Sequence, residues 1–119
     1  TLAATAVPES AMAHNTAATA QPITRPAEVS GTISSGMGED DWYNFTLASA
    51  GVFTVLLNGP AAPSNIDLFL TDDAGTTQLA SSTSASSRDA VANTAGNATY
   101  KIRVSPPASG TVSYTLLIQ

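Results

Sequence analysis

Short runs of alternating apolar and polar residues constrain this chain more than any other feature. In ATYKIRV (98–104), Tyr100, Ile102 and Val104 lie on one face of an extended strand. A period of two is typical of a β-strand that is buried on one side only. Similar runs, separated by turn residues, occur at 28–34, 41–47, 66–71 and 111–118. Seven to eight such strands without a sustained helical period predict an all-β, antiparallel β-sandwich.

Three further runs complete the predicted sheets, and TTQLASS (76–82) is the weakest of them. GVFTVLLN (51–58) is apolar on both faces, as expected of a central strand, whereas RDAVANTA (88–95) lies in a segment of low complexity and fits an edge strand. We expect the sandwich to share one core, formed by Tyr43, Phe45, Leu56, Leu68, Leu70, Tyr100, Ile102, Val104, Tyr114 and Leu116.

The first 27 residues differ from the rest of the chain. They show neither a strand period nor a helix period, and Pro8, Pro22 and Pro26 interrupt them. We therefore divide the chain into a linker or lead-in segment, residues 1–27, and a sandwich domain, residues 28–119. The first ten residues are expected to pack poorly.

Composition excludes several classes of protein. The net charge is −5 and only 4 residues are basic, so the chain lacks the basic footprint of a nucleic-acid-binding protein. No apolar run is long enough for a membrane span. Charged residues make up 11% of the chain, against about 25% in typical soluble domains. This cysteine-free, acidic, Ser/Thr-rich composition favours a secreted bacterial module.

Catalysis finds little support in the sequence. His14 is the only histidine, and it lies in the lead-in segment, where we expect it to be a solvated or lightly packed loop residue. A Ser–His–Asp triad needs a nucleophile held against the imidazole, and no G-x-S-x-G motif is present. We predict that the chain is not an enzyme.

The stretch GEDDWYNF (38–45) holds three consecutive acids before the densest group of aromatic residues. Together with Asn15 or Glu9 from the lead-in segment, the triplet could supply the hard oxygen ligands that calcium prefers. The alternative is a solvated entrance to a strand. A second acidic pair, Asp72-Asp73, stands before Ala-Gly and is interpreted as a hairpin turn, in which aspartate caps the backbone and glycine takes a positive φ.

Trp42 is the aromatic residue that alternation places opposite Tyr43 and Phe45. An indole on the outer face of a sheet can serve as a platform for a sugar ring or a peptide. It can equally pack beneath the lead-in segment. We keep Trp42 as a candidate substrate-binding residue.

Four segments in order resemble one known family. GTISSGMGEDDWYNFTL, IDLFLTDDAG, GNATYKIRV and GTVSYTLLI are similar to the successive motifs of the bacterial pre-peptidase C-terminal domain. The matching residues are Gly31, Asp41, Trp42, Tyr43, Phe45, Asp67, Leu68, Leu70, Gly75, Tyr100, Ile102, Val104, Tyr114 and Leu116. With the opening NTAATAQPI, the resemblance covers residues 12–119.

The resemblance implies a jelly-roll sandwich without catalytic activity, attached to a secreted bacterial hydrolase, above all a protease. Such a domain assists secretion or folding, or binds an insoluble protein or polysaccharide substrate. The implied partner is a covalently linked catalytic domain. The alternative function is a structural spacer or assembly module of a cell-surface or secreted protein.

The resemblance also implies a calcium site, because the similar collagen-binding domains of clostridial collagenases bind calcium. Their ions are held by acidic and amide residues of the N-terminal linker and by aspartates before the aromatic strand. Asp41 matches the strand-side ligand by position, with Asp40 and Glu39 beside it. On the linker side Asn15 is retained, and Glu9 is a further candidate.

Overall fold

The computed structural model describes residues 4–10, 14–47, 51–60, 65–83, 88–95 and 98–119, and of 88–95 the backbone alone. These residues form a short 3-10 turn, η1 (Ala17–Thr19), and ten β-strands. The strands are β1 (Thr5–Pro8), β2 (Gln21–Pro22), β3 (Ala27–Ser34), β4 (Asp41–Leu47), β5 (Gly51–Asn58), β6 (Leu68–Thr71), β7 (Gln78–Ser82), β8 (Arg88–Ala95), β9 (Ala98–Val104) and β10 (Thr111–Ile118).

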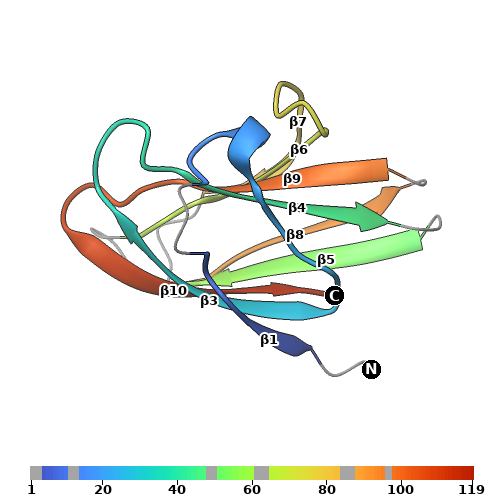
Figure 1. The fold of residues 1–119 in the computed structure, drawn as a ribbon, viewed down its shortest axis with the longest axis horizontal. Helices are drawn as coiled ribbons and strands as arrows, with labels where there is room; N and C mark the ends of the chain where they lie inside the picture. Colours follow the sequence, from blue (N-terminus) through green and yellow to red (C-terminus); the bar gives the residue numbers. More distant parts are fainter. Residues whose placement is uncertain (1–3, 11–13, 48–50, 61–64, 84–87, 96–97) are drawn as a thin grey trace.

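The strands form two five-stranded sheets that pack face to face (Figure 1). Their orders are β1-β3-β10-β5-β8 and β2-β4-β9-β6-β7. Without β1 and β2, successive strands alternate between the sheets except at the β6–β7 hairpin, which is the arrangement of an eight-stranded jelly roll. The predicted all-β jelly-roll sandwich is confirmed. The edge strand expected at residues 88–95 is present as β8, which pairs with β5.

The lead-in segment contributes a strand to each sheet. β1 pairs in parallel with β3, and β2 pairs in parallel with β4. In Figure 1 the blue segment accordingly passes from β1 on one sheet to β4 on the other. The expectation that the first ten residues pack poorly is therefore wrong for β1, and both β1 and β2 precede the expected start of the sandwich at residue 28. The two strands are too short to show a period. That residues 1–27 act as a linker in a longer protein stays a prediction.

The core lies between the sheets and contains the predicted residues with one exception. In β5 the buried side chains are Phe53, Val55 and Leu57, whereas Leu56 is half-buried on the outer face. The placement of Leu56 in the core was wrong because Val52 and Leu56 make the outer face of β5 partly apolar, which obscures the phase of the strand. Pairing with β10 supplies it: Leu57 lies opposite the buried Leu116.

The turn between β6 and β7 has the predicted form. Asp72 Oδ1 accepts hydrogen bonds from the amides of Thr76 and Thr77, at 3.0 and 3.2 Å, and Gly75 has a φ of +75°. These amides lower the pKa of Asp72, with the Thr77 backbone contributing most. In the residues described, no helix is long and apolar enough to cross a membrane.

Candidate functional site

The site is built around Asp41, the first residue of β4. Alternation along β4 buries Asp41 together with Tyr43, Phe45 and Leu47, so its carboxylate lies at the end of the core rather than in solvent. Asp41 Oδ2 accepts a hydrogen bond of 2.7 Å from the hydroxyl of Tyr114. The burial of Asp41 could be predicted from the sequence, since Asp41 stands two residues before Tyr43 and side chains two apart lie on the same face of a strand.

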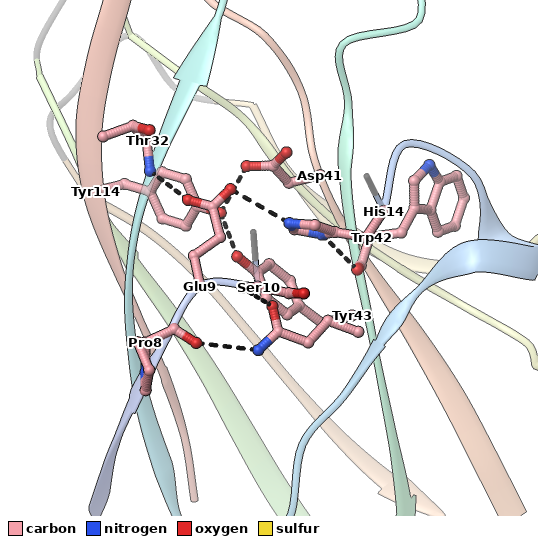
Figure 2. A network of polar contacts seen from close by, with 10 residues as sticks. Pro8, Glu9, Ser10, His14, Thr32, Asp41, Trp42, Tyr43 and Tyr114 are labelled. Carbon is pink, nitrogen blue, oxygen red and sulfur yellow. Dashed lines mark hydrogen bonds and ion pairs between the residues drawn. The ribbon is translucent and has the colours of Figure 1, made fainter. Parts of the chain in front are cut away.

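The lead-in segment brings Glu9 and His14 to Asp41 (Figure 2). His14 Nδ1 donates to the carbonyl of Trp42 at 3.0 Å, and Nε2 faces Glu9 Oε1 at 3.2 Å. Glu9 Oε2 accepts the amide of Thr32 at 2.6 Å. The expectation that His14 is solvated is wrong: it is 3% exposed. The imidazole is enclosed because the lead-in segment pairs with both sheets, through β1 and β2. The residues around His14 give no sign of that pairing.

Gly31 makes room for this cluster. A β-carbon at position 31 would lie 2.6 Å from Glu9 Oε2 and 2.8 Å from the Tyr114 ring and hydroxyl. Gly31 is also the residue of β3 that lies opposite Tyr114 in β10. A glycine in the middle of a strand therefore marks a close approach of two side chains.

Burial dominates the electrostatics of the site. It raises the pKa of Asp41 from 3.8 to about 6; the Glu9 carboxylate adds to this rise, while the Tyr114 hydrogen bond and the charge of His14 oppose it. Burial likewise raises the pKa of Tyr114 and of Tyr43, whose hydroxyls are hydrogen-bonded to each other. Since Tyr114 donates to Asp41, the Tyr43 hydroxyl donates to Tyr114.

Three potential metal ligands converge at the site. One ligand atom each from Glu9, His14 and Asp41 lies within 4.8 Å of the other two. Of the candidate metal ligands named from the sequence, Asp41 and Glu9 take part in this group. Asp40 points to Arg103, with 3.3 Å between Oδ2 and the guanidinium, and Glu39 is exposed. Asn15 follows His14 directly and is half-buried.

The donor set does not fit calcium. Calcium takes six to eight oxygen ligands, whereas this group offers two carboxylates and an imidazole nitrogen. The calcium site inferred from the resemblance stays a prediction, and the acids adjacent to Asp41 are directed elsewhere or exposed.

Trp42 lies on the outer face of its sheet, as alternation predicted, but it is half-buried. A β-carbon at Gly75 would meet the indole at 3.3 Å, so the ring lies against the β6–β7 turn. Arg103 lies opposite Trp42 in the neighbouring strand β9. The guanidinium carbon of Arg103 is 5.8 Å from the centroid of the Trp42 ring and 4.1 Å from the centroid of the Phe69 ring. Trp42, Arg103 and Phe69 thus form a row across three strands, which we call the outer row.

Comparison with known proteins supports the fold. No protein-family model matches the sequence, and no curated protein matches it. Among solved structures, the pre-peptidase C-terminal domain of a Bacillus anthracis collagenase is 18% identical, with a TM-score of 0.72 over 84% of this chain and 94% of that one. A mitogen from Yersinia pseudotuberculosis is 13% identical, with a TM-score of 0.59 over 78% of this chain and 83% of that one.

A periplasmic inhibitor of g-type lysozyme from Salmonella Typhimurium is 16% identical, with a TM-score of 0.50 over 83% of this chain and 96% of that one. At these identities the likeness concerns the fold alone. Of these three structures, the one with the highest TM-score is a pre-peptidase C-terminal domain, the family whose motifs the sequence resembles. The chain therefore has the fold of a pre-peptidase C-terminal domain.

Proposed function

We propose that this chain is a non-catalytic accessory domain of an exported hydrolase, and that it binds the insoluble polymer on which the enzyme acts. The observation that carries the proposal is the jelly-roll fold shared with the collagenase domain over 94% of that domain. The sparsely charged, acidic, cysteine-free composition is compatible with an extracellular location.

The chemistry of the site supports a non-catalytic role. The only imidazole of the chain is buried, with one nitrogen on a backbone carbonyl and the other against the Glu9 carboxylate. A general base for hydrolysis must instead reach a nucleophile or a water beside the substrate. In the described residues, the partners of His14 fasten the lead-in segment to the sandwich.

The outer row is the surface that we assign to polymer binding. Trp42 and Phe69 present half-buried aromatic rings, and Arg103 between them supplies hydrogen-bond donors. Aromatic rings with an adjacent guanidinium can contact both sugar rings and peptide segments. The ion pair with Asp40 holds the Arg103 side chain in place, so Arg103 loses less conformational entropy when a polymer binds.

A pelleting assay tests the proposal. The chain is mixed separately with fibrillar collagen, microcrystalline cellulose and chitin, and the bound fraction is measured after centrifugation. We expect retention on one polymer, and loss of retention in Phe69→Ala, whereas Val52→Ala on the outer face of the other sheet serves as the matched control. No retention on any polymer contradicts the binding role, and turnover of a peptide or glycoside contradicts the non-catalytic one.

A structural spacer is the second candidate. The observation that favours it is the attachment of the lead-in segment to both sheets, which gives a rigid mount for a neighbouring domain. The two candidates differ in the pelleting assay, because a spacer has no affinity for the polymer.

A further inference from the structure

We propose that Glu9, His14 and Asp41 form a binding site for a zinc ion, which joins the lead-in segment to the sandwich. Glu9 and His14 come from the lead-in, whereas Asp41 begins β4. The three side chains converge from separate parts of the chain in Figure 2, while the Trp42 ring points away from them. Their ligand atoms all lie within 4.8 Å of one another.

The orientation of His14 leaves a lone pair directed into the cluster. In the neutral imidazole, Nδ1 carries the proton because it donates to the Trp42 carbonyl. Nε2 is then an acceptor, and it faces Glu9 Oε1, another acceptor, at 3.2 Å. With the Asp41 carboxylate alongside, three electron-rich atoms meet at one point. Either a proton within the cluster or a metal ion between the three atoms resolves this conflict.

Each proposed ligand is also held by a second partner, as in metal sites generally. The Trp42 carbonyl fixes the imidazole, the Thr32 amide binds Glu9 Oε2, and the Tyr114 hydroxyl binds Asp41 Oδ2. The other oxygen of Glu9, Oε1, faces His14 Nε2 within the cluster. These outer contacts come from β3, β4 and β10, so the rigid part of the fold orients all three ligands.

The donor set selects zinc over calcium. Imidazole nitrogens and carboxylate oxygens are both zinc ligands, and a zinc ion held by three protein ligands takes water in the fourth position of a tetrahedron. Zinc–ligand distances of about 2.0–2.2 Å place two ligand atoms about 3.4 Å apart, so a ligand pair 4.8 Å apart must approach by about 1.4 Å. His14 Nε2 and Glu9 Oε1 already meet this spacing.

The site is reachable from solvent. A groove of about 770 Å³ is lined by Glu9, Gly31 and Tyr114, among others. The Glu9 side chain is 19% exposed, against 4% for His14. An ion therefore enters past Glu9, and the fourth ligand position can hold water from the groove.

The single histidine gives a test that needs no variant. The chain, freed of any polyhistidine tag and treated with EDTA, is titrated with zinc chloride while the imidazole nitrogen signals are followed by NMR. We expect saturation at one zinc per chain, with the His14 Nε2 signal shifted and Nδ1 still protonated. An imidazole spectrum that zinc leaves unchanged overturns the proposal, and means that a proton occupies the cluster instead.

Thermal unfolding with matched variants completes the test. Zinc should raise the melting temperature, whereas calcium at the same concentration should not. His14→Ala should abolish the zinc effect, Tyr114→Phe should weaken zinc binding by about 10–100-fold through loss of the outer hydrogen bond, and Glu39→Gln should leave it intact. A zinc effect that survives in His14→Ala, or an equal effect of calcium, overturns the proposal. Should His14→Ala fail to fold, the NMR titration decides.

Discussion

Replacing Tyr114 by phenylalanine probes the buried polar network most sharply. The change keeps the ring and removes the hydroxyl that donates to Asp41 Oδ2 at 2.7 Å and accepts from Tyr43. A hydrogen bond to a charged group contributes about 1.5–3 kcal/mol, and a buried hydroxyl left without a partner costs about 1–3 kcal/mol. We expect Tyr114→Phe to lower the free energy of unfolding by about 2–4 kcal/mol.

The direction of the bonds predicts an asymmetry. Tyr43→Phe leaves Tyr114 still donating to Asp41, so it should cost only about 1 kcal/mol. Removing both hydroxyls should cost less than the sum of the two single changes, because the double variant has no orphaned Tyr43 donor. Thr46→Val is the control, since it removes a hydroxyl from an exposed bond to Thr99 and should change stability by less than about 0.5 kcal/mol.

Urea unfolding provides the measurement. The fluorescence of Trp42, the only tryptophan, and far-UV circular dichroism report the same transition if unfolding is two-state. A Tyr114→Phe cost no larger than that of Thr46→Val, or a Tyr43→Phe cost larger than that of Tyr114→Phe, would refute the network as described.

Three further predictions concern pH and packing. In EDTA, the raised pKa of Asp41 gives stability that is present below pH 3.8 and lost as the pH rises through about 6. Urea unfolding should show a loss of about 3 kcal/mol from this group that Asp41→Asn lacks, and equal pH slopes would contradict this. Gly31→Ala should destabilise by about 1–3 kcal/mol through its clash with Tyr114, whereas Gly51→Ala, with open space around it, should not. Phe45→Ala should cost about 3–5 kcal/mol in thermal unfolding, and a cost below about 1 kcal/mol would place the ring outside the core.

The sequence predicted the parts of the fold that have a period. Tyr100, Ile102 and Val104 are buried as alternation required, and so are Leu68 and Leu70. The prediction failed in β5, because Val52 and Leu56 make its outer face partly apolar and obscure the phase of the strand. Pairing with β10 distinguishes Leu56 from Leu57. Periodicity is informative only where the two faces differ in polarity.

The candidate site was predicted only in part. Asp41 was singled out, but its burial follows from its place on the inward face of β4, which the acidic triplet obscured. His14 could not be placed, because its burial depends on parallel pairing of short lead-in strands with both sheets. Gly31 lies inside a predicted strand, and the close approach of Tyr114 is the physical reason for a glycine there.

Attachment of the lead-in segment to the sandwich is the central claim of this account, and amide hydrogen exchange tests it directly. The Trp42 amide donates to the His14 carbonyl at 2.8 Å, and the Thr32 amide donates to Glu9 Oε2. Both amides should exchange within about tenfold of the rate at Phe45 in the core, because they open only with the sandwich. Rapid exchange at Trp42 and Thr32 while Phe45 stays protected would show that the lead-in detaches on its own, and would contradict the account.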